Sequence, residues 1–231
     1  MTSSGGRSSR AWHGLIAIVV LAALITQITL ILTGGADANS GRTDSATGTG
    51  VRLFRLFSYF TIQSNLLVLA TAALLALDPW RDSRRWRVAR LDALLGIVIT
   101  GAVFGTVLAS QVHLTGLSWW LTVAFHYVSP WAYLLGWLIF GPRPRITWGT
   151  VAAAFVWPAA WITYTFVHGA LTDWYPYPFL TVTEIGYPAA LRNTGLVLVV
   201  AAALAALFKM LDARLPARAA RPEPATRTPA P

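Results

Sequence analysis

The chain has 231 residues, of which 55% are hydrophobic and 12% are charged, and its formal net charge is +9. Soluble domains carry about 25% charged residues, so this composition excludes an ordinary soluble enzyme. The sequence contains no cysteine, which excludes disulfides, thiolate metal sites and a cysteine nucleophile in this chain.

Six apolar segments are each long enough for a helix that crosses a membrane, which takes about 20 residues. None shows the alternation typical of the strands of a membrane barrel. Since only helices and closed barrels satisfy the backbone in lipid, the sequence predicts an all-α, polytopic membrane protein with six transmembrane helices in one bundle. The segments are Ala11–Thr33, Leu53–Leu77, Leu91–Val112, Leu117–Phe140, Trp148–Val167 and Leu191–Leu211.

The stretches outside these segments differ in composition. Residues 34–50 are rich in Gly, Ser, Thr and Asp and predict a mobile loop. His168–Asn193 is rich in proline and aromatic residues, which argues against regular helix. We expect a cytoplasmic N-terminus at residues 1–10, a transmembrane domain at residues 11–211 and a disordered cytoplasmic tail at residues 212–231.

The positive charges predict the orientation. Both terminal stretches and the loops after the second and fourth helices together carry 14 of the 18 Lys and Arg residues. The positive-inside rule then places both termini in the cytoplasm, and we expect a multi-pass protein of the cell (inner) membrane. The basic charge is accounted for by topology, so we expect no nucleic-acid partner.

The first apolar segment has a second interpretation. Arg7 and Arg10 precede it and Ala36-Asp37-Ala38 follows it, as in a cleaved signal peptide. However, its apolar run of about 20 residues exceeds the 7–15 usual for such peptides. We therefore favour a retained first helix.

Ionisable side chains inside a membrane helix are costly and are functional candidates by default. Asp92 begins the third segment near several arginines, so we expect a helix-start charge with a nearby partner. His126 instead lies about nine residues, or roughly 13 Å, from the outer end of the fourth helix. Pro130, four residues later, has no N–H to bond the His126 carbonyl, which predicts a kink and a polar pocket there.

The second helix supplies a possible counterpart to His126. Ser58, Thr61, Ser64 and Asn65 share one helix face. Thr61 lies eight residues into this helix, roughly 12 Å deep, which is similar to the depth of His126. A hydroxyl and an imidazole at one level can act as nucleophile and base, although small polar residues also simply join membrane helices by hydrogen bonds.

These landmarks together resemble a known family. Phe60–Leu67 in the second helix, His126 in the fourth, Phe166–His168, Trp174 and Tyr177–Leu180 occur in this order. The set is similar to the androgen-induced membrane proteins, a family that includes the androgen-dependent TFPI-regulating protein and bacterial relatives. The resemblance covers about residues 11–211 and includes the six-helix plan.

The resemblance implies threonine-dependent hydrolysis of lipid esters of the fatty acid ester type. In the family, activity depends on one Thr in the second helix and one His in the fourth, which fall on Thr61 and His126. Membrane lipids or lipid-like esters would be the substrates, without a cofactor or a metal. We expect further substrate contacts from Ser64, Asn65, His168, Trp174 and Tyr177.

Several alternatives remain open at this point. The oxyanion donors could be Ser64, Asn65 or backbone N–H groups near a kink, and either Asn65 or a backbone carbonyl could orient His126. Thr61, Asn65 and His126 could also merely tie helices together in a non-catalytic, lipid-binding or structural bundle. Haem ligation by His126 and His168 and a transport function are further alternatives, and the oligomeric state stays open.

Overall fold

The computed structural model describes residues 4–43 and 46–216. Within these ranges, six helical segments are long and apolar enough to cross a membrane, so the predicted all-α, multi-pass architecture is confirmed. The elements are α1 (Ser4–Leu32), α2 (Thr49–Ser58), α3 (Phe60–Leu77), α4 (Arg84–Val103), η1 (Phe104–Leu108), α5 (Gly116–Val123), η2 (Ala124–Val128), α6 (Ser129–Phe140), α7 (Trp148–Ala154), α8 (Val156–Thr172), η3 (Pro178–Leu180) and α9 (Val182–Arg214).

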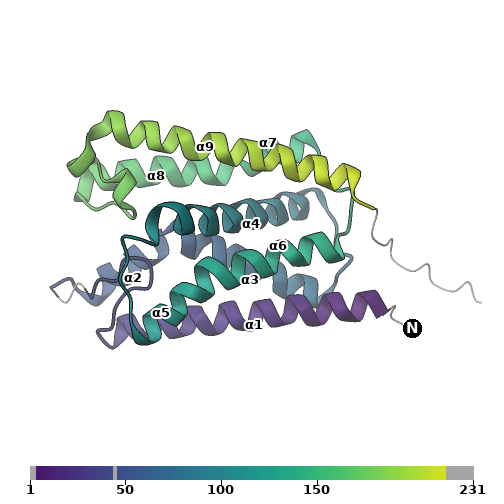
Figure 1. Cartoon of the computed structure of the whole chain (residues 1–231), viewed down its shortest axis with the longest axis horizontal. Coiled ribbons are helices and arrows are strands. Elements are labelled where there is room, and N and C mark those ends of the chain that lie inside the picture. The colour runs from purple at the N-terminus through teal and green to yellow at the C-terminus, as the bar shows by residue number, and fades with distance from the viewer. Residues whose placement is uncertain (1–3, 44–45, 217–231) are drawn as a thin grey trace, which may run out of the picture.

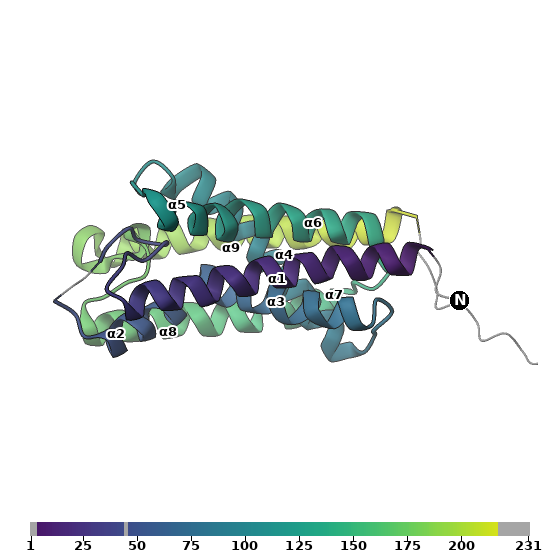
Figure 2. The same ribbon diagram turned by 90° about the horizontal axis from the view of Figure 1, so that it is seen from below.

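The helices run roughly parallel and antiparallel to one another in an elongated bundle. Figure 1 shows α8 and α9 as one layer above α4, with α1 on the opposite side and α3, α4 and α6 between them. The turned view in Figure 2 shows the same elongated arrangement from the side of α1. The start of α1 and the end of α9 lie at one end of the bundle, here named the terminal end, and α2 and the α8–α9 connection lie at the opposite end.

The second predicted helix is divided in the structure. Tyr59 has extended backbone angles and separates α2 from α3, so the continuous helix expected over Leu53–Leu77 is wrong. The indole Nε1 of Trp161 donates to the Ser58 carbonyl at 2.9 Å, so a side chain of α8 provides a hydrogen-bond donor to a carbonyl at the break. Because the first turn of a helix has unpaired backbone N–H groups, the break leaves the N–H of Thr61 free for another partner.

The fourth predicted segment is continuous but changes its winding at His126. Residues 124–128 form a π-helix, in which the Ser129 N–H donates to the Ala124 carbonyl five residues earlier. The irregularity expected from Pro130 is therefore a wider turn just before α6. Such π-turns are rare and often occur at functional sites.

The connection between α8 and α9 is shorter than expected. α8 continues to Thr172 and α9 begins at Val182, so the expectation that His168–Asn193 lacks regular helix is wrong except around residues 173–181. Gly186, with φ of 75° and ψ of 160°, interrupts α9. Glycine adopts such angles without the steric cost of a side chain, so the helix bends here two residues before Pro188.

The ends of the predicted regions also shift. α1 begins at Ser4, inside the stretch expected to be a cytoplasmic N-terminus, and α9 extends through Asp212–Arg214. The disorder expected for the tail falls mostly on residues 217–231, which lie outside the described ranges. The loop after α1 contacts the helices at Ala38, whose N–H donates to Gln27 and whose carbonyl accepts from Thr122.

Ion pairs at the terminal end connect the α3–α4 and α6–α7 loops. The Asp82 carboxylate accepts two hydrogen bonds from Arg87, at 2.6 and 2.7 Å, and forms an ion pair with Arg145. Asp212 of α9 accepts from the backbone N–H groups of Arg145 and Ile146. These contacts join loops that are distant in sequence.

Replacing Asp82 with asparagine should lower stability by less than about 1 kcal/mol, because the side chain is partly exposed to solvent. Hydrogen bonds from Arg87 hold the pKa of Asp82 well below its usual range. A depressed folded-state pKa stabilises the fold above the unfolded pKa of about 3.9. The difference in melting temperature between wild type and Asp82→Asn should therefore shrink as the pH falls below about 4, and a difference that stays constant with pH would contradict this assignment.

Candidate active site

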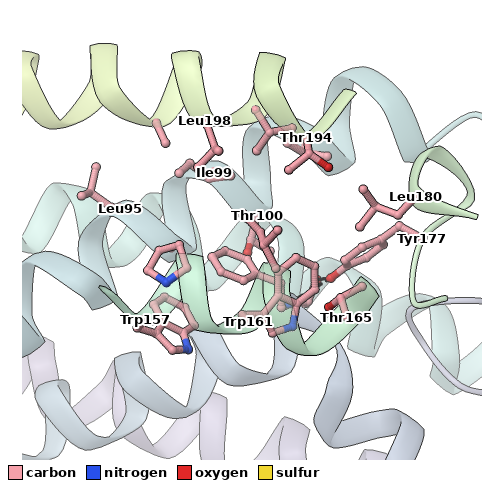
Figure 3. A pocket seen from close by; sticks show the side chains of 18 of the residues that line it. Leu95, Ile99, Thr100, Trp157, Trp161, Thr165, Tyr177, Leu180, Thr194 and Leu198 are labelled. Atoms are coloured by element: carbon pink, nitrogen blue, oxygen red, sulfur yellow. Dashed lines mark hydrogen bonds between the residues drawn. The ribbon is translucent and has the colours of Figure 1, made fainter. Parts of the chain in front are cut away.

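A cavity of about 90 Å³ lies between α4 and η2 on one side and α8 and α9 on the other. Figure 3 shows Leu95 and Trp157 towards one end of it and Leu180 and Tyr177 towards the other. Most of the lining side chains are aliphatic or aromatic, with a few hydroxyl, imidazole and carboxyl groups among them. Mostly apolar pockets with a few polar groups are the usual sites for small ligands.

Thr61 and His126 meet on the wall of this cavity. Thr61 lies in the first turn of α3 and His126 lies in the π-helix η2. The Thr61 hydroxyl oxygen is 3.4 Å from Nε2 of His126, which is slightly longer than the 2.6–3.2 Å of a strong catalytic hydrogen bond. Both side chains are at most 3% exposed, so the pair is shielded from bulk solvent.

The backbone orients the His126 ring. Nδ1 lies 3.1 Å from the carbonyl oxygen of Thr122, and a carbonyl can only accept a hydrogen bond. Nδ1 therefore carries the proton, and in the neutral ring Nε2 is the acceptor that faces the Thr61 hydroxyl. The ring also stacks on Phe104 with centroids 3.9 Å apart. Asn65 and a backbone carbonyl were the two expected orienting groups, and the carbonyl of Thr122 is the one that bonds the ring.

Tyr177 completes a chain of hydrogen bonds at Thr61. Its hydroxyl oxygen accepts from the Thr61 N–H and lies 3.1 Å from the Thr61 hydroxyl. Burial raises the pKa of Tyr177 to about 12, so the phenol keeps its proton at neutral pH. Because the oxygen already accepts from the N–H, the phenol can donate its own proton to the Thr61 oxygen, which leaves the Thr61 proton directed at His126.

The other predicted residues of α3 have structural contacts. The Asn65 side chain donates to the carbonyls of Thr61 and Phe125, at 2.9 and 3.3 Å, and so joins α3 to η2. Ser64 packs against α4, with its hydroxyl oxygen 2.9 Å from where a Cβ on Gly96 would lie. Neither residue lines the cavity, so the structure does not bring them to the ligand space.

His168 and Trp174 lie in an aromatic cluster outside the cavity. The His168 ring stacks on Tyr164 at 5.5 Å and lies 5.8 Å from Trp174. Tyr59 bridges this cluster to the site, because its ring is 5.7 Å from Trp174 and 5.6 Å from Tyr177. Since His168 does not line the cavity that His126 faces, the two imidazoles do not share a space for haem.

Three polar side chains of the cavity wall that were not predicted as site residues have an atom without a hydrogen-bond partner among the described residues. These buried atoms are the hydroxyls of Thr100 and Thr165 and one carboxylate oxygen of Asp92. Such groups are uncommon in folded proteins and suggest that a ligand or water supplies the partner. Thr100 and Thr165 gave no signal in the sequence, because isolated threonines are common in membrane helices.

The expectation that Asp92 is a paired charge at the start of a helix is wrong. α4 begins at Arg84, where the hydroxyl of Ser83 accepts from the Trp86 N–H as a cap, so Asp92 lies eight residues inside the helix. Within the part of the chain that the structure describes, it forms no ion pair with the nearby arginines. The serine before an arginine-rich first turn was the signal that would have placed it correctly.

No protein-family model, curated protein or solved structure significantly matches the chain. Among the described residues, no group of three or more His, Cys, Asp or Glu side chains could hold a metal ion. The interpretation of the site therefore depends on its own geometry.

Proposed function

We propose that this chain is a membrane hydrolase that cleaves lipid esters with Thr61 as the nucleophile and His126 as the base, as the resemblance to the androgen-induced membrane proteins implies. The observation that carries the proposal is the 3.4 Å approach of the Thr61 hydroxyl to Nε2 of His126 on the wall of an apolar cavity. An aliphatic and aromatic lining suits an acyl chain, while the two polar groups suit its ester.

The reaction would follow the usual course of acyl transfer through a covalent intermediate. Thr61 attacks the ester carbonyl as its proton passes to Nε2 of His126. The bond to the alcohol breaks, and the alcohol leaves with that proton, which gives an ester between the acyl group and Thr61. A water molecule then gives a proton to His126 and attacks this ester, and the acid is released as the proton returns to the Thr61 oxygen.

The negative charge on the carbonyl oxygen would be stabilised by hydroxyl donors on the cavity wall. Tyr177 is the foremost candidate, because its phenol is protonated and lies 3.1 Å from the Thr61 hydroxyl. The unpartnered hydroxyls of Thr100 and Thr165 also line the cavity. Oriented donors of this kind are worth about a hundredfold or more in rate when they meet the developing charge.

We further propose that both termini are cytoplasmic, in an inner (cell) membrane. This rests on the arginines of the α3–α4 and α6–α7 loops, which lie at the terminal end together with the end of α9. Thr61 and His126 would then occupy the outer half of the bilayer, where a lipid ester reaches the cavity from the outer leaflet.

A non-catalytic lipid-binding bundle is the second candidate function. It is favoured by the bonds of Asn65 to Thr61 and Phe125, which show that part of this polar cluster joins helices. Under this alternative, substitutions at Thr61 and His126 lower stability without changing any turnover.

A fluorophosphonate probe that reacts with activated serine and threonine hydroxyls separates the two functions. We expect the purified protein to be labelled and Thr61→Ala to lose the label. Thr106→Ala, which removes an exposed hydroxyl that donates to the Ala102 carbonyl, is the matched control and should be labelled like wild type. Labelling that persists in Thr61→Ala would remove Thr61 as the nucleophile.

A further inference from the structure

A carboxyl group lies at the far end of the cavity from the Thr61–His126 pair. Asp92 and Thr100 both line the cavity on α4, and they are eight positions apart, which corresponds to about 12 Å along the helix. α4 runs from the terminal end towards the opposite end. Asp92 therefore lies towards the terminal end, while Tyr177, which bonds Thr61, lies in the α8–α9 connection at the opposite end.

The wall between these two polar ends is apolar. Leu95 and Ile99 of α4 face Leu198 of α9 across this stretch, and Trp157 closes one side (Figure 3). An extended chain advances about 1.2 Å per covalent bond along its axis. The separation of the two polar ends, about 12 Å along α4, therefore corresponds to the length of an unbranched alkyl chain of about ten carbons.

The environment of Asp92 indicates what the far end of that chain carries. One of its carboxylate oxygens is buried without a hydrogen-bond partner, and no arginine forms an ion pair with it among the described residues. A methyl group at this position would leave the oxygen unpaired, whereas a donor would satisfy it. An ammonium group brings three N–H donors. One turn further along α4, the lining residues Leu95 and Gly96 have no side-chain acceptor, and the indole N–H of Trp157 is a donor that already bonds Gln63.

We propose that the cavity recognises an unbranched acyl chain with a hydroxyl group at its far end, and that Asp92 accepts a hydrogen bond from this hydroxyl. We place the ester of this chain at Thr61, and this placement rests on the proposed hydrolase function. The recognition of the terminal hydroxyl by Asp92 does not depend on whether the ester is cleaved.

The test compares two methyl ketones, which present a carbonyl but have no leaving group. One has a plain unbranched chain of about ten carbons and the other has a terminal hydroxyl on the same chain. Binding to the full-length purified protein is measured by titration calorimetry in detergent. We expect the hydroxyl to tighten binding to wild type by about tenfold, as one buried hydrogen bond to a carboxylate provides.

Variants at Asp92 assign this difference to the carboxyl group. Asp92→Leu should bind both ketones equally, and Asp92→Asn, which keeps a carbonyl acceptor, should retain a preference for the hydroxyl. Asp78→Asn is the matched control. The Asp78 carboxylate accepts a hydrogen bond from the Trp80 N–H in the α3–α4 loop and does not line the cavity. The preference of this variant should equal that of wild type.

The outcomes separate this proposal from the hydrolase function. If Thr61→Ala keeps the hydroxyl preference and no ester is ever cleaved, the recognition by Asp92 stands and the hydrolase proposal fails. If wild type cleaves plain esters but binds the two ketones equally, the recognition is overturned. A preference that persists in Asp92→Leu, or tighter binding of the corresponding terminal amine, would overturn it as well.

Discussion

Replacing His126 with glutamine should lower the rate of ester hydrolysis by at least about a hundredfold, the usual contribution of a general base. Glutamine is similar in size and can still bond the Thr122 carbonyl, but its side chain cannot take up a proton from Thr61. His168→Gln is the matched control. His168 stacks on Tyr164 outside the cavity, so this variant should hydrolyse esters at a rate within about twofold of wild type.

The measurement is the initial rate on a medium-chain chromogenic ester, together with the melting temperature of each purified variant. His126 is buried against Phe104, so some loss of stability is expected and must be separated from the loss of rate. A folded His126→Gln protein with undiminished hydrolysis would exclude His126 as the base. Equal losses of rate in His126→Gln and His168→Gln would instead place the chemistry outside the cavity.

The number and rough limits of the membrane helices could be predicted because apolar length is a local property of the sequence. The interruptions could not be predicted, because they depend on distant partners. The break at Tyr59 accompanies a bond from Trp161 to the Ser58 carbonyl, more than one hundred residues away in the chain. No pattern within the second apolar segment encodes that bond.

The candidate site could be predicted from the sequence to a similar extent. Helix rise alone placed Thr61 and His126 at similar depth, but their contact depends on how α3 packs against η2. The part played by Tyr177 depends on the free N–H of Thr61, which exists only because the helix is interrupted. Asp92 was misplaced because the apolar run begins at Leu91, whereas the capped helix begins at Arg84.

Replacing Gly169 with alanine should destabilise the protein and lower hydrolysis together. Alanine normally stabilises a helix interior by about 1 kcal/mol relative to glycine, and Gly169 lies within α8. Here, however, a Cβ would lie only 2.1 and 2.2 Å from two ring atoms of Tyr175. An overlap of this size with a buried ring costs about 1–3 kcal/mol, so the clash outweighs the helix preference.

The expected loss of activity follows from the position of Tyr175. To relieve the clash its ring must move, and the backbone that it shares with Tyr177 two residues later must adjust. Tyr177 would then lose its bonds to the N–H and hydroxyl of Thr61, and we expect hydrolysis to fall by about a hundredfold, as for one lost donor to the developing charge.

Two further variants make this prediction specific. Gly195→Ala on α9 is the matched control, because a Cβ there meets no atom within 4 Å, and it should leave hydrolysis unchanged and raise stability by up to about 1 kcal/mol. In the double variant Gly169→Ala/Tyr175→Leu the smaller side chain leaves room for the added methyl group, so stability should recover relative to Gly169→Ala. If Gly169→Ala is as stable and as active as Gly195→Ala, then Tyr175 does not hold the α8–α9 connection against α8, and the position of Tyr177 at Thr61 must be maintained by other contacts.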